Sequence, residues 1–185
     1  MCHAALEGGA RLIQYREKHK AFAEMVKEAE EVKKLCNRYG ATLIINDRVD
    51  LAKEIDANGV HLGQEDADIE KARHELAGKI IGLSATSLDE ALEAQAKGAD
   101  YIGAGPVFET PSKDDAAPPF GLKTLAEIKR HVSVPIIAIG GITKENMASV
   151  LEAGADAVAV ISAIAGANDM VEATRDLINE PSAKR

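Results

Sequence analysis

The sequence predicts an α/β protein, a (β/α)8 barrel that lacks its first strand. Short apolar or β-branched runs alternate with amphipathic stretches along the whole chain, and most runs start about 20 residues after the one before, the length of a compact βα unit. No glycine-rich nucleotide-binding motif follows the first run. The seven predicted strands are 10–14, 42–46, 59–63, 79–84, 100–105, 134–140 and 156–162.

Helices are predicted between these strands from the spacing of apolar residues. The clearest covers 20–38, where Phe22, Met25 and Val26 begin an apolar face that continues to Leu35, opposite a face of Glu and Lys. Residues 2–7 resemble the tail of a further helix. The other predicted helices are 48–55, 68–76, 87–97, 122–131, 143–152 and 168–178.

A short repeat joins helix ends to strand starts. It occurs as Gly8-Gly9-Ala10, Ala57-Asn58-Gly59, Gly98-Ala99-Asp100 and Gly154-Ala155-Asp156. Glycine after a helix adopts the left-handed conformation that turns the chain back toward the sheet. Several strands are apolar at successive positions, which is typical of parallel strands covered on both faces.

Both an open doubly wound sheet and a closed barrel fit this alternation. The open sheet predicts G-x-G-x-x-G after the first strand, whereas residues 14–18 read QYREK, so the barrel is favoured. A complete barrel has eight strands and about 250 residues. Because the chain has 185 residues and seven predicted strands, the strand expected before the helix at 2–7 is missing.

Composition limits the classes of function. With 46% apolar and 28% charged residues, residues 1–185 are expected to form one domain. The net charge of −8 and the small number of aromatic residues, three Phe and three Tyr, argue against nucleic acid as a partner. Neither a membrane span nor a secretion signal is recognisable, so we expect a cytoplasmic protein with small-molecule partners, and a homo-oligomer stays open. Cys2 and Cys36 fit neither a disulfide framework nor a zinc site.

Basic and acidic side chains follow the first three predicted strands. Arg16 and Lys18 suit a phosphate or diphosphate, although a solvated charge run is the alternative. Asp47 and Asp66 are the oxygen ligands that Mg2+ prefers, although each could instead cap the helix that follows. In a barrel these positions share the carboxyl-terminal rim, where active sites lie.

Later loops add candidate phosphate contacts. Lys113 lies in the long segment 105–115, which we interpret as a binding loop rather than a surface connection. Gly140 and Gly141 end one strand and Ile161 and Ser162 end the next, a pairing that favours a phosphate cradle of backbone N–H groups over a tight turn. The histidines, His61 among them, form no catalytic triad and are interpreted as surface or packed residues.

The chain resembles the thiamine-phosphate synthase family over almost its whole length. The matching segments are GGARLIQYREK (8–18), LIINDRVDLA (43–52), GVHLGQED (59–66), GLS (82–84), 100–113, AIGGI (138–142) and 154–164. The resemblance implies a barrel enzyme that uses Mg2+ to join a pyrimidine diphosphate to a thiazole phosphate, with loss of diphosphate and capture of a pyrimidinylmethyl cation by the thiazole nitrogen.

The resemblance also implies roles for individual residues. Those matching the pyrimidine diphosphate site are Gln14, Tyr15, Arg16, Glu17, Lys18, Asn46, Ser84 and Lys113, of which Arg16, Lys18, Ser84 and Lys113 are the catalytic candidates. Asp47 and Asp66 match the Mg2+ ligands. Those matching the thiazole phosphate site are Thr110, Pro111, Ser112, Gly141, Ile161 and Ser162.

Two departures from the family pattern are visible. Ser112 stands where Thr is common, and the family's first strand is missing. Two other functions stay open: a thiazole tautomerase, which needs neither diphosphate nor metal, and an inactive fragment that binds phosphate ligands.

Overall fold

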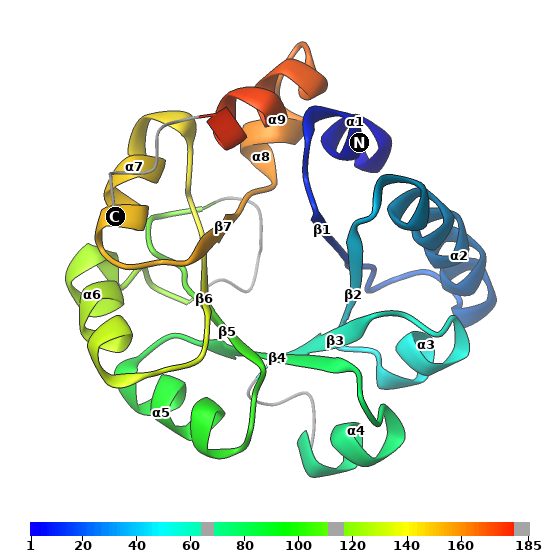
Figure 1. The fold of residues 1–185 in the computed structure, drawn as a ribbon, viewed down its shortest axis with the longest axis horizontal. Helices are drawn as coiled ribbons and strands as arrows, with labels where there is room; N and C mark the ends of the chain where they lie inside the picture. The colour runs from blue at the N-terminus through cyan, green and yellow to red at the C-terminus, as the bar shows by residue number, and fades with distance from the viewer. Residues whose placement is uncertain (64–68, 111–116, 180–185) are drawn as a thin grey trace.

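Seven parallel strands curl into a ring with the helices outside it (Figure 1). The computed structural model describes residues 1–63, 69–110 and 117–179. The strands are β1 (Leu12–Tyr15), β2 (Thr42–Asn46), β3 (Gly59–Leu62), β4 (Ile80–Ala85), β5 (Tyr101–Ala104), β6 (Ile136–Ile139) and β7 (Ala157–Ala159). The helices are α1 (Cys2–Gly8), α2 (Phe22–Tyr39), α3 (Val49–Glu54), α4 (Ile69–Glu75), α5 (Leu88–Ala96), α6 (Gly121–His131), α7 (Lys144–Glu152), α8 (Ser162–Ala165) and α9 (Met170–Asn179).

The strand order is β1 to β7, so each strand pairs with its neighbour in the sequence. This is the order of a barrel rather than of a doubly wound sheet, in which the order reverses at one point. All seven predicted strands are confirmed. The last is shorter than 156–162, because the chain leaves the sheet after Ala159 and enters α8, a four-residue helix that the sequence did not predict.

The middle of the sheet is covered on both faces. Leu43, Ile44 and Ile45 are successive residues of β2, and each has no exposed surface. Because neighbouring side chains in a strand point to opposite faces, β2 is packed both toward the helices and toward the barrel interior. The unbroken apolar run of β2 therefore belongs to a strand covered on both faces, as predicted.

The two outer strands are different. In the described residues β1 and β7 pair with β2 and β6 only, and Leu12 of β1 keeps 43% of its surface exposed. Outside this seam α1 packs on α9, so closely that a Cβ on Gly8 would lie 2.5 Å from the Cβ of Thr174. The fold is thus a TIM-like barrel with seven strands, open where the sequence predicts the missing one.

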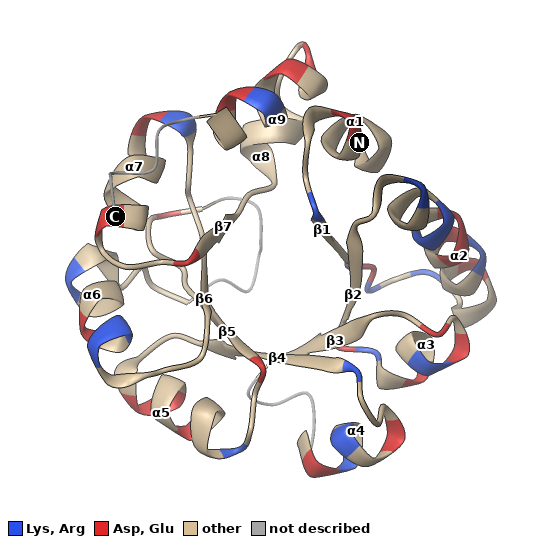
Figure 2. Ribbon diagram, in the orientation of Figure 1, with Lys and Arg blue, Asp and Glu red and all other residues tan. Residues whose placement is uncertain are grey.

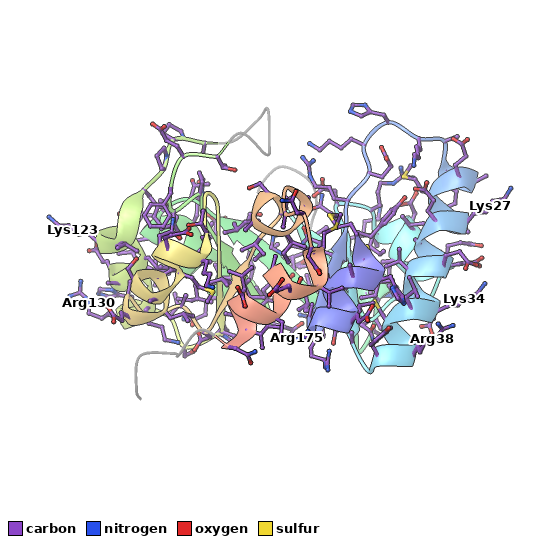
Figure 3. The ribbon with its side chains drawn as sticks, turned by 90° about the horizontal axis from the view of Figure 1, so that it is seen from above. Lys27, Lys34, Arg38, Lys123, Arg130 and Arg175 are labelled. Atoms are coloured by element: carbon purple, nitrogen blue, oxygen red, sulfur yellow. The ribbon has the colours of Figure 1, made fainter. Side chains whose placement is uncertain are left out.

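Charged residues lie mainly on the outer helices and at the strand ends, whereas most of the strand ribbon carries none (Figure 2). Lys34, Arg38 and Lys123 on α2 and α6 point outward into solvent (Figure 3). None of the helices in the described part of the chain has the length and apolar character that crossing a bilayer requires.

Candidate functional site

The carboxyl ends of the strands meet at one rim, because all the strands are parallel. Gln14, Asn46 and Ser84 stand at or next to the ends of β1, β2 and β4. The segments that follow β1 and β5 rise from this end of the ring (Figure 3). The rim therefore gathers side chains that are far apart in the sequence.

The segment after β1 is tied to α2. Tyr15 donates a hydrogen bond to Glu28 of α2 at 2.9 Å, and Lys20 is bonded to the other oxygen of the same carboxylate. Glu17 accepts the backbone N–H of His19 at 2.8 Å. Lys20 holds the pKa of Glu28 below its usual value, and burial together with Glu28 raises the pKa of Tyr15. Between these anchors the exposed side chains of Arg16 and Lys18 are carried by an ordered turn.

Asp47 follows β2 in a strained conformation. Its φ is 61°, a region that residues other than glycine rarely adopt, and its N–H donates to the carbonyl of His61 at 2.8 Å. The alternative that Asp47 caps the next helix is wrong, because Arg48 is the N-cap of α3. Backbone strain of this kind is concentrated at functional sites.

Of the two predicted Mg2+ ligands, only Asp47 belongs to the described residues. Asp47 is half-buried at the rim and offers a hard oxygen donor of the type that suits Mg2+. Asp66 lies outside the described residues. Within the described ranges no group of three or more His, Cys, Asp or Glu side chains is placed to hold a metal, so the pair stays a prediction.

Ser84 is hydrogen-bonded to His61, and His61 in turn is hydrogen-bonded to Tyr101. The sequence did not identify either residue as part of the site. His61 of β3 lies 2.9 Å from the Ser84 hydroxyl through Nε2 and 2.9 Å from the Tyr101 hydroxyl through Nδ1. His61 is 8% exposed, which confirms it as a packed histidine. The signal in the sequence was one polar residue inside the otherwise apolar strand GVHL.

The loops after β5 and β6 are bonded together. Val107 donates its N–H to Ile139 at 2.9 Å, and Phe108 donates to Gly140 at 3.0 Å. Gly141 has a φ of 62°, and a Cβ there would lie 2.8 Å from the Cβ of Phe108. The half-buried Thr110 is thereby carried close to the predicted phosphate cradle. Pro111, Ser112 and Lys113 lie outside the described residues.

Asn146 also shapes this loop, and the sequence did not single it out. Its side chain donates to the carbonyl of Gly141 at 2.9 Å and accepts the N–H of Thr143 at 2.9 Å. Thr143 and Asn146 form the capping box of α7, so a T-x-x-N pattern before an apolar run could have identified it. Gly141 is therefore fixed from both sides.

The last predicted contacts follow β7. Ile161 is the N-cap of α8 and Ser162 is its first residue, and both side chains are exposed. The N–H groups of a first helical turn have no partner within the helix and suit an anion. A phosphate role for these residues agrees with this placement and stays a prediction.

Fold and rim together define a class: barrel enzymes that bind phosphorylated small molecules at the carboxyl ends of their strands. Residues 1–164 match the family model described as thiamine monophosphate synthase. A thiamine-phosphate synthase of Chloroflexus aurantiacus is 51% identical over 94% of this chain and 81% of its own length. One of Methanosarcina mazei is 46% identical over 95% and 73%.

A solved structure gives the same result. Thiamine phosphate pyrophosphorylase from Pyrococcus furiosus superposes with a TM-score of 0.92 at 46% identity, covering 97% of this chain and 86% of that one. The chain belongs to the thiamine monophosphate synthase family, and its enzyme class is that of the thiamine-phosphate synthases. The resemblance inferred from the sequence is confirmed.

Proposed function

We propose that this chain condenses hydroxymethylpyrimidine diphosphate with hydroxyethylthiazole phosphate, forming thiamine phosphate and releasing diphosphate. The observation that carries the proposal is the convergence of Gln14, Asn46 and Ser84 at the rim of a barrel that is about half identical to synthases so named. Both substrates are small phosphorylated molecules, which suits an acidic protein that carries Arg16 and Lys18 at that rim.

The diphosphate is proposed to lie over the segment after β1. Arg16 would bind it with two parallel N–H donors, and Lys18 and Lys113 would add point charges. The Tyr15–Glu28 bond and the Glu28–Lys20 pair support this role, because they fix the turn that carries Arg16 and Lys18. The resulting cluster of positive charge would stabilise diphosphate as it leaves.

Asp47 and Asp66 would hold Mg2+. The half-buried carboxylate of Asp47, at the end of a strand next to the proposed diphosphate position, fits an ion that prefers oxygen ligands. When bound, Mg2+ would neutralise charge on the diphosphate oxygens. The strained backbone of Asp47 agrees with a residue kept for binding rather than for stability.

The thiazole phosphate is proposed to bind on the opposite side of the rim. Its contacts would be Thr110, Pro111, Ser112, Gly141, Ile161 and Ser162. The bonded loops after β5 and β6 and the start of α8 provide backbone N–H groups there. The two substrates would then face each other across the mouth of the barrel.

The reaction is proposed to be dissociative. The bond between the pyrimidinylmethyl carbon and the diphosphate oxygen breaks first, and both electrons leave with the oxygen. The lone pair of the thiazole nitrogen then forms the new C–N bond with the cation. The residues act by positioning and by stabilising charge, and no side chain of the protein is covalently modified.

The test is product formation from both substrates with Mg2+. We expect thiamine phosphate and diphosphate in equal amounts, and none when either substrate is omitted or the metal is chelated. Aromatisation of a thiazole tautomer without the pyrimidine substrate would favour a tautomerase instead. Binding of both phosphates without product would identify an inactive binder.

The proposed place of this reaction is the cytoplasm. Substrates that carry a phosphate or a diphosphate are charged, and charged groups cross the apolar core of a bilayer poorly. An enzyme that uses them is expected in the compartment where they are made. Fractionation of cells that produce the protein checks this expectation.

A further inference from the structure

Two successive peptide groups in the loop after β6 are held by their carbonyl oxygens. The carbonyl of Gly140 accepts the N–H of Phe108 at 3.0 Å. The carbonyl of Gly141 accepts the side-chain amide of Asn146 at 2.9 Å. Both peptide groups are trans, so the N–H of each points away from its own carbonyl. The N–H groups of Gly141 and Ile142 are thereby turned away from the donors that hold the loop.

These two N–H groups are suited to an anion. Gly140 and Gly141 have φ values of 99° and 62°, and successive N–H groups beside left-handed residues form small concavities that bind anions. Among the residues that the structure describes, no oxygen accepts the N–H of Gly141 or Ile142. Because Gly141 is one of the contacts proposed for the thiazole phosphate, the direction of these N–H groups decides how well the phosphate is bound.

The orientation of the Asn146 amide is fixed by its two partners. A carbonyl oxygen can only accept a hydrogen bond and a backbone N–H can only donate one, so Nδ2 faces Gly141 and Oδ1 faces Thr143. Both distances are 2.9 Å, and the side chain is half-buried. None of these groups is titratable, so the arrangement does not depend on pH.

The same position in two other helices shows what a helix cap alone requires. Asn146 is the third residue of α7, and Glu24 and Glu90 are the third residues of α2 and α5. Each glutamate accepts one backbone N–H near its helix start, from Ala21 at 3.3 Å and from Thr86 at 2.6 Å. A carboxylate has no N–H to donate. The amide in α7 therefore caps its helix as the carboxylates do and, in addition, holds the loop after β6.

We propose that Asn146 is a positioning residue that makes the barrel selective for a phosphorylated thiazole. By holding the carbonyl of Gly141, it fixes the N–H of Ile142 next to the N–H of Gly141. Both donors are then in place before the phosphate arrives, and binding does not have to order them. Asn146 therefore increases the affinity for the phosphate ester and does not change the affinity for the corresponding alcohol, hydroxyethylthiazole.

This inference rests on the proposed function for the identity of the ligand. Its test measures dissociation constants of hydroxyethylthiazole phosphate and of the alcohol for the wild type, Asn146→Leu and Asn146→Asp. The leucine is neutral but cannot cap the helix, whereas the aspartate can accept the N–H of Thr143 but adds a charge. What the two variants share is the loss of the N–H donor to Gly141.

We expect the affinity for the thiazole phosphate to fall about tenfold in both variants, while the affinity for the alcohol stays within a factor of about two. Asn146→Gln keeps a donor and an acceptor, and it is expected to recover part of the phosphate affinity lost in Asn146→Leu. The dissociation constant of the pyrimidine diphosphate should change less than about twofold, because its proposed contacts lie on the opposite side of the rim. A role in stability alone would lower the melting temperature and leave the preference for phosphate unchanged.

The matched control is Glu90→Leu, at the same position of α5. It removes the acceptor for the N–H and the hydroxyl of Thr86, at 2.6 and 2.9 Å, and leaves the loop after β6 intact. We expect the melting temperature to fall, as in Asn146→Leu, and the preference for the thiazole phosphate over the alcohol to stay at the wild-type value. An equal loss of that preference in the two leucine variants would overturn the inference, because any weakened helix cap would then have the same effect.

The outcomes for this inference and for the proposed function are distinguishable. If the wild type prefers the thiazole phosphate through Asn146 but forms no thiamine phosphate, the proposed function fails and the positioning role stands. If product forms and the preference is the same in the wild type, Asn146→Leu and Asn146→Asp, the positioning role fails and the proposed function stands. A wild type that binds the thiazole phosphate no more tightly than the alcohol also overturns the inference.

Discussion

The two rims of the barrel use the same kind of residue for opposite purposes. At the amino ends of the strands, Asn58, Asp100 and Asp156 each accept the backbone N–H of a neighbouring strand, at 2.8 Å in all three cases. At the carboxyl ends, Asp47 stands in a left-handed conformation with its carboxylate half-buried at the mouth. At the amino ends the side chain completes the hydrogen bonds of the sheet, whereas at the carboxyl ends Asp47 lies at the mouth of the barrel.

The difference teaches that position in the barrel, rather than residue type, decides what an aspartate does. Asp100 and Asp156 are further held by Arg73 at 2.9 Å and Lys129 at 2.7 Å, so their charges are paired within the fold. Asp47 accompanies the residues proposed to bind charged ligands. These stabilising contacts lie at one end of the strands, and the proposed chemistry lies at the other.

The largest expected effect is a loss of activity without a loss of stability when the carboxylate of Asp47 is removed. Asp47→Asn is expected to lower kcat about 100-fold to 1000-fold, the loss typical of removing one group that stabilises charge in a transition state. The melting temperature should stay the same, because the side chain is replaced by one of equal size. Steady-state rates over a range of Mg2+ concentrations measure the loss.

Its matched control is Asp50→Asn, three residues along the chain. Asp50 pairs with Arg48 at 2.6 Å, and that pairing holds the pKa of its carboxyl below the usual value. Because Asp50 is proposed neither as a metal ligand nor as a substrate contact, activity should be retained. Equal losses in the two variants would contradict a specific role for the Asp47 carboxylate.

The next effect concerns the amino-terminal rim. Asp156→Ala is expected to cost about 1–3 kcal/mol of unfolding free energy, because the N–H of Ile136 loses its acceptor. Denaturant unfolding measures the loss, and KM values should be unchanged. In Asp176→Ala, which removes only a surface pair with Lys144, the cost should stay below about 1 kcal/mol. If the two variants lost the same unfolding free energy, the hydrogen bond from Ile136 to Asp156 would contribute no more than a surface ion pair.

A smaller effect is expected at the turn that carries Arg16 and Lys18. Tyr15→Phe removes the hydrogen bond to Glu28, a contribution of about 0.5–1.5 kcal/mol. The KM for the pyrimidine diphosphate should rise by up to about tenfold, while the KM for the thiazole phosphate stays constant. An equal rise for both substrates would show that the turn does not serve the diphosphate alone.

The smallest effect has the opposite sign. Asp47→Gly relieves the strain of a positive φ and is expected to stabilise the fold by up to about 1 kcal/mol, while activity is lost. Denaturant midpoints for this variant and Asp47→Asn measure the difference. A less stable glycine variant would mean that the carboxylate also supports the fold.

The sequence predicted the barrel because alternating periods and spacing are local properties of the chain. It also predicted the rim, because residues that follow parallel strands must meet at one end. It did not predict α8, since four residues are too few to show a helical period. The bond from His61 to Tyr101 joins positions 40 residues apart, and no local pattern marks it.

In the repeat that ends in Asp100 and Asp156, the sequence explains the glycines but not the aspartates. The glycines are predicted to end the helices, and Gly98 and Gly154 do have φ values of 80° and 106°. The aspartate that follows has a role of its own, because its carboxylate accepts a backbone N–H of a neighbouring strand. Hydrogen bonds between units of a repeat appear only when the units are placed side by side.

The contact between Gly8 and Thr174 has a consequence for synthesis of the chain. The helix α1 leaves the ribosome long before α9, one of the elements on which it packs, has been made. Contacts between residues so far apart in sequence carry a high entropic cost and form late in folding. We therefore expect the face of α1 that packs on α9 to stay exposed in the nascent chain until α9 has been made, which gives chaperones a long period of access to that face.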